Sequence, residues 1–107
     1  MSGLTAPIGD NGRMGDGQTT ISSGDVEVRV DRLAGGRVAQ ICVAGVPLLV
    51  GADDAGTSAI AWGAYPMVPW AGRIRAGRFD FDGRRHQLPL NHGGHAMHGV
   101  GLAMPWD

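Results

Sequence analysis

The chain has 107 residues, which is enough for at most one small domain. A net charge of −1 gives no reason to expect nucleic acid or an acidic membrane as a partner. The sequence contains no run of about 18 apolar residues and no signal-peptide pattern, so we predict no membrane span and interpret the chain as cytoplasmic. Cys42 is the single cysteine, which excludes a disulfide framework.

Residues 1–20 are rich in glycine, aspartate, serine and threonine and show no hydrophobic periodicity. Such a segment buries too little apolar surface to offset the entropy lost on ordering. We therefore predict a disordered tail over residues 1–20 and one ordered domain over residues 21–107.

The ordered part begins with β patterns. Residues 25–31 alternate between valines and charged side chains, which indicates a strand with one buried face. A glycine-containing turn follows, and residues 37–43 are apolar on both sides, as in a strand covered on both faces. After a second turn, residues 46–50 complete a predicted meander of three short strands.

The second half of the chain continues this pattern. Residues 59–70 are apolar, but prolines interrupt them and predict irregular or edge structure. Residues 78–90 predict a hairpin around Asp82-Gly83, a strong two-residue turn signal. Because no ten-residue helical pattern occurs anywhere, the predicted fold class is all-β, with strands spaced as in a sandwich.

Two polar side chains in this half are candidates for ligand binding. Arg73 offers five N–H donors in a rigid fork, although a solvated surface arginine is the simpler interpretation from the spacing alone. His98 can donate and accept at once, which suits a hydroxyl ligand, and it could also be an ordinary loop histidine. His92, His95 and His98 recur every three residues, but their loop holds no carboxylate or thiol, so we predict no metal site.

The aromatic residues allow two interpretations, because such rings stack on the apolar faces of sugars but also dominate the cores of small domains. We expect Trp106 to be a core residue. Trp70 lies close to Arg73 in sequence and is the best candidate for the wall of a binding pocket.

The segment from Trp62 to Trp106 resembles the aldose 1-epimerase (galactose mutarotase) family. The resemblance rests on four motifs in a fixed order and spacing: Gly-Arg-Ile at residues 72–74, Phe-x-x-Asp-Gly at 79–83, Leu-x-x-Asn at 88–91, and His98-Gly99. It implies a galactose mutarotase-like β-sandwich (supersandwich) of which this incomplete chain forms the N-terminal portion.

The resemblance also implies roles for individual residues. Arg73 and His98 match family residues that contact the sugar, and Trp70 would stand beside them. Many members have asparagine where this chain has Gly72, and many have a second glycine where it has Val100. The family's general acid, a histidine, and its general base, a glutamate, are expected beyond residue 107.

The resulting hypothesis is an isomerase that interconverts the α and β anomers of a free aldose in carbohydrate metabolism, without a cofactor. This chain would carry part of the sugar-binding site only, and its partner would be a small-molecule sugar. Two alternatives stay open: a non-catalytic carbohydrate-binding β-sandwich module, and a small metal-binding sandwich that uses the three histidines.

Overall fold

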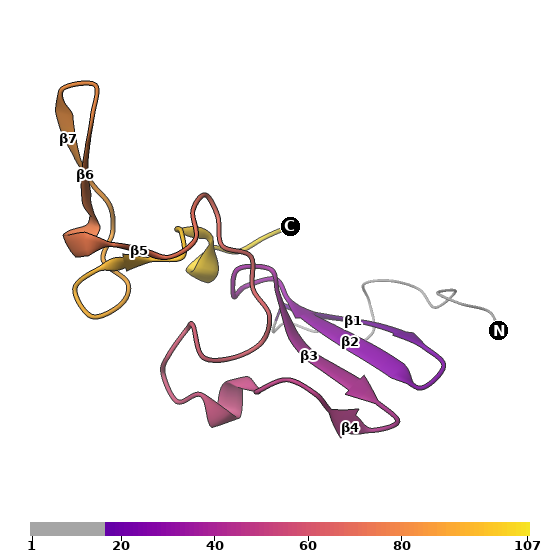
Figure 1. Ribbon diagram of the computed structural model, residues 1–107. Coiled ribbons are helices and arrows are strands. Elements are labelled where there is room, and N and C mark those ends of the chain that lie inside the picture. Colours follow the sequence, from indigo (N-terminus) through magenta and orange to yellow (C-terminus); the bar gives the residue numbers. More distant parts are fainter. Residues whose placement is uncertain (1–16) are drawn as a thin grey trace. The chain divides into compact units, whose positions relative to one another are not determined.

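The computed structural model describes residues 17–107 of the chain, and strands dominate this part (Figure 1). The strands are β1 (Gln18–Ser23), β2 (Val26–Asp31), β3 (Arg37–Val43), β4 (Val46–Pro47), β5 (Arg73–Ile74), β6 (Arg78–Phe81), β7 (Arg84–Gln87) and β8 (Ala96–Met97). Three single 3₁₀ turns are η1 (Ala52–Asp54), η2 (Arg75–Gly77) and η3 (Gly101–Ala103). The all-β prediction is confirmed, and no helix within residues 17–107 is long and apolar enough to cross a membrane.

The described residues divide into two compact units. The first unit comprises residues 17–66 together with Leu102–Asp107, and the second comprises Met67–Gly101. The first unit holds the larger sheet, whereas the second holds all the residues for which we predict a role in ligand binding.

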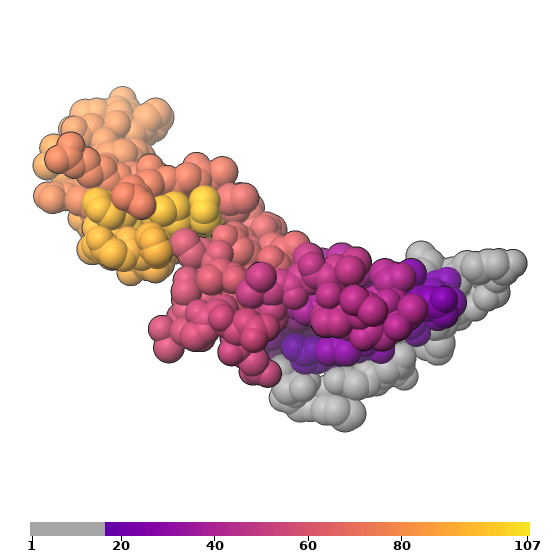
Figure 2. Space-filling view, turned by 60° about the horizontal axis from the view of Figure 1, so that its bottom comes forward, coloured from indigo at the N-terminus to yellow at the C-terminus, as the bar shows by residue number. Residues whose placement is uncertain are grey.

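An antiparallel sheet with the strand order β1-β2-β3-β4 forms the first unit (Figure 1). The same strands lie side by side, from indigo to magenta, in the space-filling view (Figure 2). The strand predicted over residues 25–31 is confirmed as β2, which pairs with β1 on one edge and β3 on the other.

Strand β1 begins at Gln18, earlier than the boundary that we predict for the tail at residue 20. Thr19, Thr20 and Ile21 are β-branched and therefore favour strands. This preference decides the structure only when a partner strand lies alongside. The partner here is β2, with Ile21 opposite Val28. Residues 1–16 of the predicted tail lie outside the described residues.

The third strand of the predicted meander is shorter than expected, because β4 ends at Pro47. Proline has no N–H to donate, which weakens the backbone ladder at this position. The Leu48 N–H still donates to the Ile41 carbonyl at 2.9 Å. The side chain of Gln40 adds further bonds: its Oε1 accepts from the N–H groups of Leu48 and Leu49 at 3.1 and 2.7 Å, and its Nε2 donates to the Leu49 carbonyl at 2.8 Å.

A buried arginine organises the first unit. Only 1% of the surface of Arg37 is exposed, and its guanidinium donates to four backbone carbonyls, those of Ala34, Ala59, Trp62 and Leu102, at 2.8–3.4 Å. Burial lowers the pKa of Arg37, and the nearby ionisable groups of Tyr65 and Asp31 act in the opposite direction. One side chain thereby fastens a turn, a loop and the C-terminal segment to strand β3.

Two aromatic rings pack against this arginine. The Arg37 guanidinium carbon lies 4.1 Å from the centroid of the Trp62 ring and 5.0 Å from that of Tyr65, which are cation–π distances. Trp106 lies against Gly36 but remains 41% exposed, so the expectation that it belongs to the core is wrong for this chain.

The second unit contains the predicted hairpin, β6–β7, and a small two-stranded sheet of β5 and β8. Asp82 and Gly83 both have positive φ, +54° and +74°, as a tight two-residue turn requires. Asp80 on β6 pairs with Arg85 on β7 at 3.0 Å, so an exposed ion pair joins the two strands of the hairpin. The β5–β8 pairing places Arg73 opposite Met97 and so joins the two halves of the candidate site.

Candidate functional site

Gly72 is the point at which the predicted ligand-binding residues meet. Its carbonyl oxygen accepts from the backbone N–H of His98 at 2.9 Å and from the indole Nε1 of Trp70 at 3.1 Å. Its own N–H donates to Nδ1 of His98 at 3.0 Å. Gly72 therefore connects Trp70 and His98, and Arg73 follows directly in the chain.

The backbone conformation at residue 72 explains the glycine. Its φ is +91°, in the left-handed region that residues with a Cβ rarely adopt, although a Cβ here would meet no atom within 4 Å. Conformation rather than lack of space thus favours glycine at this position.

A different physical constraint explains the glycine of the His98-Gly99 pair. His98 itself has φ of +60°, an uncommon conformation for a residue with a side chain. Gly99 has φ of +82° and lies so close to the backbone of Val68 that a Cβ would come within 1.9 Å of the Val68 carbonyl oxygen. The pair thus turns the chain sharply and seats its backbone against the segment that leads to Trp70.

The hydrogen bond from Gly72 decides which nitrogen of His98 carries the proton. Because Nδ1 accepts the Gly72 N–H, the neutral ring must carry its proton on Nε2. The Nε2 side of the ring is therefore a hydrogen-bond donor. A donor of this kind can bind a ring oxygen or hydroxyl oxygen of a ligand, but it cannot at the same time act as a base.

Arg73 lies at the start of β5 and is exposed. Arg73 pairs with Met97, and Met97 directly precedes His98. The backbone of Arg73 therefore lies close to the histidine. Within residues 17–107, no carboxylate forms an ion pair with Arg73. Its guanidinium is thus not held in an ion pair within this part of the chain.

Asn91 is the last residue of the Leu-x-x-Asn motif, and the structure gives it a specific position. Its side chain forms hydrogen bonds to backbone groups on both sides of His98. An asparagine two residues before the Gly93-Gly94 turn was the available signal, since asparagine side chains commonly bond to nearby backbone.

The three histidines of this loop do not converge on one point in a way that offers a metal site. Nδ1 of His95 accepts the N–H of Ala76 at 3.0 Å, just as Nδ1 of His98 accepts that of Gly72. Among the residues that the structure describes, no group of three or more histidine, cysteine or acidic side chains could hold a metal ion.

We therefore expect added zinc to leave the melting temperature of the protein unchanged. Nδ1 of His95 and Nδ1 of His98 each accept a backbone N–H, and zinc binding through these atoms would have to break both hydrogen bonds. In these two rings only the Nε2 atoms remain as alternative ligands. Differential scanning calorimetry with stoichiometric zinc, against the same sample with a chelator, measures this. A raised melting temperature would restore the metal-binding hypothesis.

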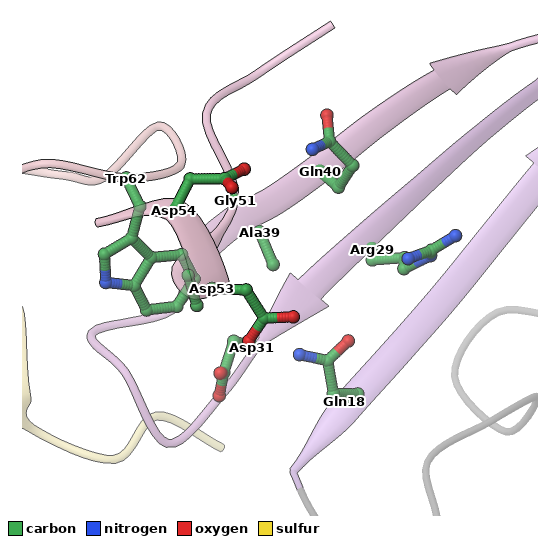
Figure 3. Close-up of a pocket in the computed structure, with 10 residues that line it drawn as sticks. Gln18, Arg29, Asp31, Ala39, Gln40, Gly51, Asp53, Asp54 and Trp62 are labelled. Carbon is green, nitrogen blue, oxygen red and sulfur yellow. The ribbon is translucent and has the colours of Figure 1, made fainter. Parts of the chain in front are cut away.

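A cavity of about 410 Å³ lies in the first unit (Figure 3). Figure 3 shows the ring of Trp62 at one side of it, with the carboxylates of Asp31 and Asp53 and the amide of Gln18 nearby. None of the three predicted ligand contacts lines this cavity. The chain's only glutamate, Glu27, also belongs to this unit, where its carboxylate pairs with Arg29 at 2.9 Å.

The chain is similar to two solved structures, a galactose 1-epimerase and a putative aldose 1-epimerase. The chain is similar to a galactose 1-epimerase from Lactobacillus acidophilus NCFM, with 26% identity, a TM-score of 0.55, and coverage of 81% of this chain and 27% of that one. It is also similar to a putative aldose 1-epimerase from Escherichia coli K12, with 30% identity, a TM-score of 0.65, and coverage of 82% of this chain and 30% of that one. No curated protein sequence matches the chain.

The sequence profile of the family described as aldose 1-epimerase matches residues 18–107, and the chain belongs to this family. The resemblance identified from the four motifs is thereby confirmed, and so is the predicted all-β fold of the galactose mutarotase type. The chain spans less than a third of the length of either solved structure.

Proposed function

We propose that this chain carries part of the sugar-binding site of an isomerase that interconverts the α and β anomers of a free aldose. The observation that best supports this is the arrangement around Gly72, which brings the Nε2–H donor of His98 and the ring of Trp70 together next to Arg73. Membership of the aldose 1-epimerase family supplies the class of reaction.

In this reaction, the residues that bind the sugar are distinct from the groups that transfer protons. A base removes the proton of the anomeric hydroxyl, the bond between C1 and the ring oxygen breaks, and an acid protonates that oxygen. Rotation about C1–C2 and closure on the other face of the aldehyde then give the other anomer. In our proposal the proton-transfer pair lies outside residues 1–107, since His98 is held as a donor and Glu27 pairs with Arg29.

The roles of the three site residues follow from their donors and surfaces. The guanidinium of Arg73 would donate to vicinal hydroxyls, which match its forked geometry. His98 would donate from Nε2 to a ring or hydroxyl oxygen. The indole of Trp70, whose N–H is already bound to the Gly72 carbonyl, would offer its face to the apolar side of the sugar.

Polarimetry of freshly dissolved α-D-glucose or α-D-galactose tests the proposal. We expect the natural polypeptide that carries these residues to speed equilibration, and Arg73→Ala to lower kcat/KM by about tenfold or more, since hydrogen bonds to charged groups contribute about 1.5–3 kcal/mol. His98→Ala removes a neutral donor, which contributes about 0.5–1.5 kcal/mol, and should lower kcat/KM by up to about tenfold. Arg84→Ala is the matched control, because Arg84 is an exposed arginine of the same unit outside the site.

The isolated 107-residue chain is expected to be inactive in the same assay. Clear activity from it would show that the proton-transfer groups are misplaced. An unchanged kcat/KM in both Arg73→Ala and His98→Ala would show that the assigned contacts are wrong. Sugar binding by the natural polypeptide without any acceleration would instead favour a non-catalytic carbohydrate-binding module.

A further inference from the structure

The side chain of Asn91 holds the two residues that flank His98. Its Oδ1 accepts the N–H of Met97 at 2.7 Å, and its Nδ2 donates to the carbonyl oxygens of Met97 at 3.0 Å and Gly99 at 3.4 Å. The amide thus uses both its acceptor and its donors on backbone groups. None of these hydrogen bonds reaches the histidine ring itself.

His98 requires support of this kind because its backbone is in the left-handed region, with φ of +60°. This conformation is unfavourable for a residue with a Cβ, so the surrounding contacts must maintain it. The preceding residue, Met97, is fixed by β8, and the following residue, Gly99, is fixed against Val68. The side chain of Asn91 bonds to both of these neighbours.

We infer that Asn91 is a positioning residue that keeps the ring of His98 aligned with the Gly72 N–H, and so keeps His98 an Nε2–H donor. If Met97 and Gly99 were released, the peptide groups on either side of His98 could rotate, and the 3.0 Å bond between Gly72 N–H and Nδ1 would lengthen or break. The neutral ring would then be able to carry its proton on either nitrogen.

The rest of the loop does not depend on this side chain. The backbone N–H groups of Asn91 and His92 both donate to the His95 carbonyl, and the His95 N–H donates to the His92 carbonyl. Removal of the amide should therefore leave the turn at residues 91–95 closed and loosen only residues 97–99. The step from the histidine ring to the sugar rests on the proposed function, whereas the step from Asn91 to the ring does not.

Nitrogen NMR of isotope-labelled histidine in the natural polypeptide tests the first step, with the His98 signals assigned by their loss in His98→Ala. In the wild type we expect one unprotonated ring nitrogen and one protonated nitrogen for His98. In Asn91→Ala we expect these two signals to shift toward each other as the tautomers mix. By polarimetry, kcat/KM should fall about tenfold, which is the effect of losing roughly one net hydrogen bond.

Gln87→Ala is the matched control. Gln87 is also a side-chain amide of the second unit that donates to backbone carbonyls, those of Ala76, Gly77 and Leu88, but none of them flanks His98. This variant should leave the His98 signals and kcat/KM as in the wild type. Asn91→Asp is the second variant: it keeps the acceptor for the Met97 N–H, loses both donors, and carries the test if Asn91→Ala does not fold.

The outcomes separate the two proposals. His98 signals that stay at wild-type positions in the folded Asn91 variants would overturn the positioning role, whatever the activity. The same change of signals in Gln87→Ala would also overturn it, because the effect would then be a general loosening of the unit. Altered signals in the Asn91 variants of a polypeptide that neither binds nor converts aldoses would uphold the positioning role and refute the proposed function.

Discussion

Arg37→Met is expected to lower the free energy of unfolding by about 3–5 kcal/mol, since a buried polar group left without its partner costs roughly 1–3 kcal/mol and several carbonyls lose theirs together. Methionine preserves much of the apolar volume over Trp62 but donates no hydrogen bonds. The carbonyls of Ala34, Ala59 and Trp62 would stay in place without their shared donor. Urea unfolding of the natural polypeptide, followed by tryptophan fluorescence, measures the change.

Two further substitutions sharpen this result. Arg37→Lys keeps the charge but replaces a fork of donors with a compact ammonium, so we expect a loss of stability between wild type and Arg37→Met. Arg29→Ala removes an exposed ion pair with Glu27 and should cost no more than about 1 kcal/mol. If Arg37→Met were as mild as Arg29→Ala, the buried guanidinium would not be the organising contact of the first unit.

Gly99→Ala is expected to destabilise the second unit and to disturb His98 at the same time. The left-handed backbone costs about 1–2 kcal/mol for a residue with a Cβ, and overpacking typically adds about 1–3 kcal/mol. The added Cβ would lie 1.9 Å from the Val68 carbonyl oxygen and 2.3 Å from its carbon, so the two backbone segments must separate. Binding of an aldose should weaken together with stability.

Gly94→Ala provides the control for this variant. Gly94 has φ of +79°, close to the +82° of Gly99, but a Cβ on Gly94 would meet no atom within 4 Å. The difference between the two alanine variants therefore isolates the contact with Val68 from the cost of the backbone conformation. Equal losses of stability in urea unfolding would contradict the close approach at Gly99.

The sequence was informative where local pattern and turn chemistry decide structure. The alternation of residues 25–31 predicted β2, and Asp82-Gly83 predicted the β6–β7 hairpin. Strand β1 was missed because Thr19, Thr20 and Ile21 stand among polar residues, and their pairing with β2 depends on a neighbour that no local window includes.

The candidate site could be predicted in its members but not in its connections. Arg73, His98 and Trp70 were singled out from residue type and family motifs, and their roles stay predictions. The Gly72 carbonyl accepts hydrogen bonds from both the indole N–H of Trp70 and the backbone N–H of His98. This arrangement depends on tertiary packing, which the local sequence does not reveal. Arg37 was missed because an arginine at the start of an apolar strand is usually solvated, and only the fold supplies its four carbonyl acceptors.

The open space beside Gly72 suggests how the specificity of such a site could vary among relatives without a change of fold. A left-handed φ selects against most side chains, but asparagine is among the few that tolerate it, and a Cβ here meets nothing within 4 Å. Asparagine at residue 72 would therefore carry the strain of the left-handed backbone but would meet no steric obstacle. An asparagine would add one side-chain amide beside Arg73 and His98, which a glycine lacks. This amide would change which arrangement of hydroxyl groups on a ligand such a site binds best.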